Sequence, residues 1–305
     1  IALISVIMTF ANMIDMLTVN PCIKTAMKAS PHTFDSLLSD KLTADMLPNF
    51  IYGSYTGLAV TVFGLVPTIT AMFGKSILPS LAESCAKNNK KAMQSGLTKM
   101  LIVTSIIAIP AGMGIAVLSE PILRFLFGGR ETEIQVCIMP MSILGIAVIF
   151  LAIATPCFSI LQTLGKPHKA IIIMLAGGII KLFLNIILIR QPIINISGAA
   201  ISTLVSEVFI CVLSVRSVCK MTDLKPKVSE IFVKPTYAAI MCSVTAVLSH
   251  ETLTKIAHLQ INHRFVTLFS IGIGSTMYFF CLYLLCETPK NIVNYIFSKK
   301  NPQNP

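Results

Sequence analysis

The stretch from Phe158 to Ser206 reads FSILQTLGKPHKAIIIMLAGGIIKLFLNIILIRQPIINISGAAISTLVS. It contains the end of one apolar segment, a short basic turn at 165–169, a second apolar segment that holds the single cation Lys181, and a third that runs into Glu207. A lone charge inside an apolar helix costs free energy, and such residues are candidate functional residues. We therefore expect a charged helical hairpin, with the rest of the chain built around it as a scaffold.

The composition indicates a membrane protein. Of the 305 residues, 54% are hydrophobic and 12% are charged, whereas soluble domains have about 25% charged residues. The mean hydropathy is +0.80. Several uncharged runs exceed the roughly 18 residues that mark a candidate spanning helix. None of them shows the alternating polarity of a barrel strand, so the sequence predicts an all-α integral membrane protein.

We expect about eight transmembrane helices. Their approximate ranges are 1–19, 49–86, 100–118, 134–164, 170–189, 197–215, 235–249 and 265–286. The second range is longer than one crossing needs and contains Gly64 and Pro67, which predicts a kinked or broken helix. Gly53 and Gly57 are four residues apart in the same range, and this spacing permits a close approach to a neighbouring helix.

The basic residues predict a membrane surface as partner, not a nucleic acid. The net charge is +11, but the cations lie in loops between apolar runs and form no patch with interleaved aromatics. Alternate loops carry 14 and 8 Lys and Arg residues. The richer set includes the C-terminal tail, so the C-terminus is expected in the cytoplasm of a multi-pass cell-membrane protein.

No motif of an enzyme is present in the sequence. There is no GxSxG, Walker or HExxH pattern, and the nine cysteines lie mostly inside apolar runs without metal-binding spacing. We therefore expect no enzymatic activity, no cofactor and no metal site. The chain begins at Ile1, inside an apolar run and without an initiator Met, so we also expect it to be a fragment.

Two charges are expected near the middle of the membrane. Lys181 lies nine residues before Arg190, and Glu207 lies nine after Gly198. Each is therefore roughly 14 Å below the outer face of a hydrocarbon core about 30 Å thick. Two interpretations stay open: an ion pair between them with a structural role, or a cavity in which Lys181 receives an anionic group. Asn185 shares the face of Lys181.

Three further residues are candidates near the outer side. Asp15 lies in the outer half of the first span, with Asn12 one turn earlier on the same face. Asp15 could bind a proton or a cation, or pair with a neighbouring helix, and the sequence favours neither. Tyr52 is a candidate for substrate contact, but an interfacial aromatic belt explains Tyr52 and Tyr55 more simply.

Several segments resemble stage V sporulation protein B-like polysaccharide exporters. The segment 51–89, IYGSYTGLAVTVFGLVPTITAMFGKSILPSLAESCAKNN, resembles their eighth helix, with its Tyr-Gly pair, Pro67 and the closing Leu-Pro-x-Leu-x-Glu at 78–83. The segments ILQTLGKPHKA, GGIIKLFLNIILI and ISGAAIST are similar to the tenth to twelfth helices, and 12–15 matches the polar end of the seventh. The resemblance covers nearly the whole chain, and it depends on the order and spacing of these segments.

This resemblance implies the fold of the multidrug/oligosaccharidyl-lipid/polysaccharide exporter superfamily, which includes the lipid II flippase MurJ. Such exporters have two six-helix lobes, and some have two extra C-terminal helices. The chain would correspond to helices 7 to 14 of a 14-helix protein. Residues 1–220 would form the six-helix C-terminal lobe without its N-terminal counterpart, and residues 221–305 the two additional transmembrane helices and a polar tail.

The implied function is that of a flippase in cell-wall synthesis or sporulation. It would move an undecaprenyl-pyrophosphate-linked peptidoglycan precursor or polysaccharide unit across the cytoplasmic membrane by alternating access, driven by a membrane potential or an ion gradient. Its partners would be the lipid-linked glycan, membrane lipids and cell-wall synthesis proteins. The candidate substrate-binding residues are Lys181, Asn185, Asn12 and Tyr52, and the candidates for ion coupling or an ion pair are Asp15 and Glu207.

Three other functions stay open. A cation-coupled multidrug antiporter of the same fold would depend on Asp15 or Glu207 and tolerate the loss of Lys181. A nontransporting membrane scaffold for cell-wall synthesis would tolerate neutralisation of all three charges. An integral-membrane transferase is disfavoured, because the loops contain no acidic motif.

Overall fold

The computed structural model describes residues 2–30, 43–87, 89–224, 229–257 and 263–285, and all regular structure within these ranges is helical. The elements in chain order are α1 (Ala2–Ala29), α2 (Leu47–Ser54), the π-helical η2 (Tyr55–Val60), α3 (Thr61–Phe63), α4 (Leu65–Ala86), α5 (Lys90–Val117), α6 (Ser119–Phe127), α7 (Glu131–Thr163), α8 (Pro167–Leu188), α9 (Ser197–Thr222), the π-helical η3 (Ser229–Val233), α10 (Lys234–Ala257) and α11 (His263–Leu285).

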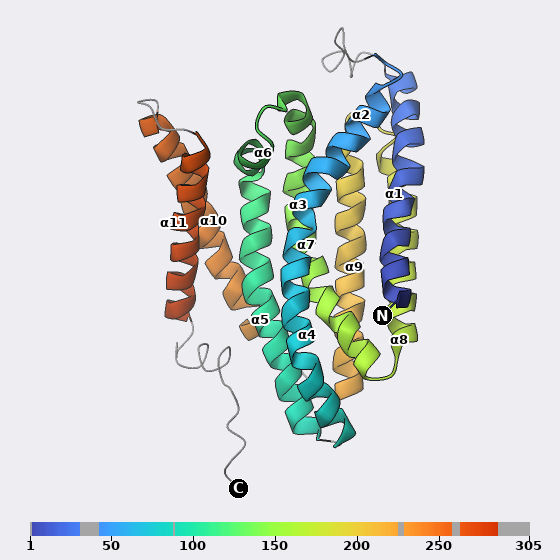
Figure 1. Cartoon of the computed structure of the whole chain (residues 1–305), viewed down its shortest axis with the longest axis vertical. Coiled ribbons are helices and arrows are strands. Elements are labelled where there is room, and N and C mark those ends of the chain that lie inside the picture. Colours follow the sequence, from blue (N-terminus) through green and yellow to red (C-terminus); the bar gives the residue numbers. More distant parts are fainter. Residues whose placement is uncertain (1, 31–42, 88, 225–228, 258–262, 286–305) are drawn as a thin grey trace.

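The helices have the lengths of membrane spans. Within the described ranges, seven stretches are long and apolar enough to cross a membrane: the run from α2 to α4, α5, α7, α8, α9, α10 and α11. The 28-residue α1 lies beside α8 (Figure 1). With α1, the described part of the chain contains eight long helical stretches, which confirms the prediction of an all-α protein with about eight transmembrane helices.

Helix α7 is the centre of the bundle. It packs against α9, α5 and α4 as well as the short elements around them. Helix α1 forms one edge through its contacts with α8 and α2, and the α10–α11 pair forms the opposite edge, where α10 packs against α5 (Figure 1). The charged hairpin of α8 and α9 therefore lies between α1 and α7.

The long second span is broken, as its glycines and prolines predict. The π-helical η2 is followed by the short α3, and Gly64 separates α3 from α4. Pro67 has no N–H to donate to the carbonyl of Phe63. Next to it, the hydroxyl of Thr68 donates to the Gly64 carbonyl at 2.8 Å. A π-helical turn inside a helix often marks a functional site, and this break forms one wall of the cavity described below.

Helices α5 and α7 approach closely at two glycines. A Cβ atom on Gly145 would lie 2.5 Å from the backbone nitrogen of Ala116, and one on Gly112 would lie 2.6 Å from the carbonyl oxygen of Gly145. Small residues at such crossings allow helices to pack in a membrane. At Gly53 and Gly57, whose spacing permits a close approach, a Cβ atom meets no atom within 4 Å.

We predict that Gly145→Ala lowers the free energy of unfolding by about 1–3 kcal/mol, because the added methyl group overlaps the backbone of α5. The matched control is Gly57→Ala, which adds the same methyl group in open space. Unfolding in detergent micelles measures both. Equal effects of the two substitutions would contradict the α5–α7 crossing.

Candidate functional site

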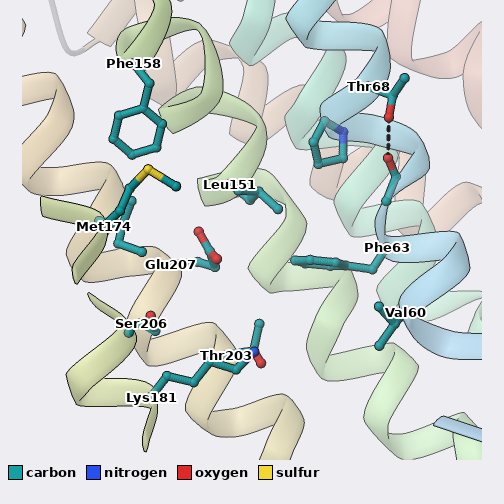
Figure 2. Close-up of a pocket in the computed structure, with 14 residues that line it drawn as sticks. Val60, Phe63, Thr68, Leu151, Phe158, Met174, Lys181, Thr203, Ser206 and Glu207 are labelled. Atoms are coloured by element: carbon teal, nitrogen blue, oxygen red, sulfur yellow. Dashed lines mark hydrogen bonds between the residues drawn. The ribbon is translucent and has the colours of Figure 1, made fainter. Parts of the chain in front are cut away.

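A cavity of about 320 Å³ lies within the bundle, between the broken second span, α7, α8 and α9 (Figure 2). The broken span contributes one wall through Val60, Phe63 and the turn at Gly64, and α8 and α9 contribute the wall across from it. Most of the lining is apolar. Its polar side chains are those of Thr68, Lys181, Thr203, Ser206 and Glu207.

The ammonium group of Lys181 forms a buried ion pair with Asp15 of α1. The Nζ atom donates to Asp15 Oδ2 at 2.7 Å, and the two residues are only 8% and 7% exposed. Lys181 also lines the cavity. An ion pair between Lys181 and Glu207 was one of the two interpretations left open by the sequence, and the structure places Asp15 at the ammonium group instead.

Asn185 connects three helices through its fully buried side-chain amide. Its Nδ2 atom donates to Asp15 Oδ1 at 2.9 Å and to Thr18 Oγ1 at 3.1 Å. Its Oδ1 atom accepts a hydrogen bond from the hydroxyl of Ser202. Both the NH₂ group and the oxygen of this amide therefore have hydrogen-bond partners. The polar strip predicted from Lys181 and Asn185 exists, and it joins α8 to α1 and α9.

Glu207 lies in the same cavity as Lys181, but among the described residues it takes part in none of the ion pairs. Its carboxylate is drawn between Leu151 and the wall formed by α8 and α9 in Figure 2. The Oε2 atom is buried and has no hydrogen-bond partner among the residues that the structure describes. A buried carboxylate without a partner is costly, so Glu207 is the group in this cavity best placed to take up a proton or a small cation.

Small residues hold α8 against α9 along the hairpin. The hydroxyl of Ser206 donates to the carbonyl oxygen of Gly177 at 2.9 Å. A Cβ atom on Gly177 would lie 2.4 Å from the side chain of Ile210, and one on Gly198 would lie 2.9 Å from the backbone carbon of Leu188. The glycines in the hairpin sequence therefore set the distance at which Lys181 and Glu207 share one cavity.

Of the six candidate residues, Lys181 and Glu207 line this cavity. Asp15 and Asn185 belong to the hydrogen-bond network that holds Lys181, and the other two lie elsewhere or cannot be placed. Tyr52 of α2 is partly buried against the core formed with α1 and α7, and it does not line the cavity. Asn12 belongs to α1, but its side chain lies outside the part that the structure describes. The aromatic-belt interpretation is wrong for Tyr55, which is 1% exposed and packs in the core.

Four further polar residues of the site were not candidates from the sequence: Thr18, Ser202, Thr203 and Ser206. All four lie in the hydrogen-bond network or the cavity wall. For the three residues on α9, the signal in the sequence was the spacing of three to four residues between polar positions on one helix face. That pattern is also typical of ordinary helix packing in membranes.

We predict that Asp15→Asn lowers the free energy of unfolding by about 3 kcal/mol, because it leaves a buried ammonium group without its counter-charge. The double variant Asp15→Asn/Lys181→Met should recover most of that loss, because no uncompensated charge remains. Unfolding in detergent micelles measures both variants.

The control for this experiment is Asp223→Asn. Asp223 pairs with Lys90 at 3.2 Å, and both side chains are more than two thirds exposed, so the same substitution should cost less than about 1 kcal/mol there. A loss at Asp15 no larger than the loss at Asp223 would contradict the buried pair.

Comparisons with known proteins identify the family. A family model described as lipid II flippase MurJ matches residues 50–269. The chain is 26% identical over 136 residues to the lipid II flippase MurJ of Bacillus subtilis (strain 168), a match that covers 45% of this chain and 25% of that protein. It is 22% identical over 184 residues to stage V sporulation protein B of the same organism, covering 59% and 34%.

The fold also has a solved counterpart. A transporter of the MOP superfamily from Pyrococcus furiosus has a TM-score of 0.52 and 14% identity, with 88% of this chain and 64% of that chain covered. The matches to the two Bacillus proteins span about a third or less of their lengths. Because the family model covers more than two thirds of the 305 residues, the chain belongs to the lipid II flippase MurJ family.

Proposed function

We propose that this chain forms the substrate-binding C-terminal lobe of a flippase for lipid-linked glycans. The substrate would be an undecaprenyl-pyrophosphate-linked peptidoglycan precursor or polysaccharide unit, moved across the cell membrane by alternating access. The observation that carries the proposal is the ammonium group of Lys181 on the wall of a cavity inside an apolar bundle. Family membership supports it, since one relative is named as a flippase of lipid II.

Lys181 would bind the pyrophosphate group. An ammonium group has three N–H donors, and the structure gives one of them to Asp15. The remaining donors are available to phosphate oxygens, and a charge-assisted hydrogen bond is strong where water is scarce. Asn185 would act indirectly, because it holds Asp15 and so fixes the position of the ammonium group.

Glu207 would couple transport to a cation. Asp15 already has Lys181 as its counter-charge, so Glu207 is the carboxylate left to bind a proton or a monovalent cation. With Glu207 ionised, the pyrophosphate would meet a like charge in the same cavity. Neutralising Glu207 would remove that repulsion, so cation and substrate would each favour the binding of the other.

The arrangement of the helices supports an orientation and a division of the chain. The α4–α5 turn, the α7–α8 turn and the end of α9 lie at the same end of the bundle (Figure 1), and all three regions are rich in Lys and Arg. We assign this end to the cytoplasm, together with the C-terminus. Residues 1–220 would be the C-terminal lobe, and residues 221–305 would add the α10–α11 pair and the tail.

A multidrug antiporter of the same fold is the second candidate. The observation in its favour is the unpaired carboxylate of Glu207 in a mostly apolar cavity, which would suit a lipophilic cation. Glu207→Gln should then abolish drug efflux, whereas Asp15→Asn/Lys181→Met should preserve it. If the chain is part of a flippase, the double variant should reduce transport more than Glu207→Gln does.

We predict that Asp15→Asn/Lys181→Met binds and transports a lipid-linked pyrophosphate glycan about ten- to a hundredfold less well than the unmodified chain, because a charge-assisted hydrogen bond to phosphate is lost. The assay uses proteoliposomes with the chain joined to the N-terminal lobe of a matched flippase. It follows the exposure of a fluorescent lipid-linked glycan to a quencher that cannot cross the membrane.

Lys91→Met is the control, because it removes an exposed cation outside the cavity and should leave transport unchanged. The double variant removes both charges of the Asp15–Lys181 pair, and the unfolding measurement in detergent micelles checks that it is folded before its transport is compared. Normal transport by the folded double variant would exclude Lys181 from the substrate path.

A further inference from the structure

A second pocket, of about 360 Å³, opens between α8 and α9 at the end of the hairpin where α8 begins and α9 ends. Three cations line it: Lys169 in the first turn of α8, and Arg216 and Lys220 in the last two turns of α9. Ile172, Ile173 and Leu213 supply its apolar part, and Ser217 adds a hydroxyl group. It shares no residue with the cavity that holds Lys181.

The pocket is formed by two helix faces that the sequence specifies. Positions 169, 172 and 173 on α8 are separated by three and four residues, and so are positions 213, 216, 217 and 220 on α9. Residues with these spacings lie on one face of a helix. The cations and the apolar residues therefore occur together on each of the two facing surfaces.

No carboxylate in the described part of the chain forms an ion pair with the cations of this pocket, Lys169, Arg216 and Lys220. Asp223 lies three residues beyond Lys220, but it is paired with Lys90. Three cations that converge without a carboxylate fit an anionic ligand from outside the chain.

The apolar residues identify the kind of anion. Ile172 is 62% exposed, and it belongs to a helix with the length and hydropathy of a membrane span. An acyl chain would cover this side chain, while the cations lie at the end of the span, where headgroups are found. Arginine in particular binds phosphate oxygens through two parallel N–H groups.

We propose that this pocket, which we call the hairpin-end pocket, binds the phosphate headgroup of an anionic phospholipid, with an acyl chain against Ile172 and Leu213. The bound lipid would hold the start of α8 beside the end of α9. This site is independent of the transport proposal, because it uses neither Lys181 nor Glu207.

Native mass spectrometry of the whole chain in detergent tests the proposal. The chain is titrated separately with dioleoylphosphatidylglycerol, with dioleoylphosphatidylcholine and with inorganic phosphate. We expect phosphatidylglycerol to bind tightest. In Arg216→Gln/Lys220→Gln, its affinity should fall about tenfold or more, because two of the three cations are lost, and the affinity for phosphatidylcholine should not change.

The matched control is Lys91→Gln/Lys166→Gln. It removes the same charge from two exposed cations at the same end of the bundle, outside the pocket, and should change the affinity less than about twofold. An equal loss of phosphatidylglycerol affinity in the control would mean that the lipid is attracted by the overall positive charge of this end, and the proposed site would be wrong. Equal binding of phosphatidylcholine, or inorganic phosphate that binds as well as the lipid, would overturn it too.

Discussion

The buried ion pair between Asp15 and Lys181 is the interaction on which the interior of this bundle depends. Either charge alone would be costly in an apolar bundle. Together they join α1 to α8, with 2.7 Å between the Nζ atom of Lys181 and the Oδ2 atom of Asp15. Asn185 extends the pair to Thr18 and Ser202 and so includes α9. A polar network whose groups are satisfied specifies one arrangement of its helices, and here it sets the relative position of three spans.

The cavity next to this pair is a consequence of irregular backbone. Gly64 and Pro67 interrupt the second span, and the interruption faces the α8–α9 hairpin across the cavity. Broken helices are tolerated at membrane depth where they line a cavity. On the other side of α7, the crossing at Gly112 and Gly145 is tight. The charges lie beside the cavity and not at this crossing.

Much of this fold was predictable from the sequence, because length and hydropathy alone define membrane spans. The hairpin at 158–206, the break near Gly64 and the presence of charges inside apolar helices all follow from local patterns. The identity of the ion-pair partner of Lys181 does not follow from a local pattern. Glu207 is closer to Lys181 in the sequence and was therefore considered as its partner. Asp15 is 166 residues away in the sequence, and only tertiary packing brings it close to Lys181. The same holds for the Gly145 crossing and the burial of Tyr55, since the residues alone do not show which face of a helix meets a neighbour.

The proposed mechanism requires that Lys181 touches the phosphate of the substrate. The most direct measurement is a solid-state NMR distance between the ¹⁵N-labelled Lys181 Nζ atom and the ³¹P nuclei of a bound undecaprenyl-pyrophosphate glycan. The account predicts a nitrogen–phosphorus distance of about 4 Å or less, as a charge-assisted hydrogen bond requires, and the signal should disappear in Asp15→Asn/Lys181→Met. Bound substrate with no phosphorus near Lys181 would contradict it, and Lys181 would then be a structural partner of Asp15.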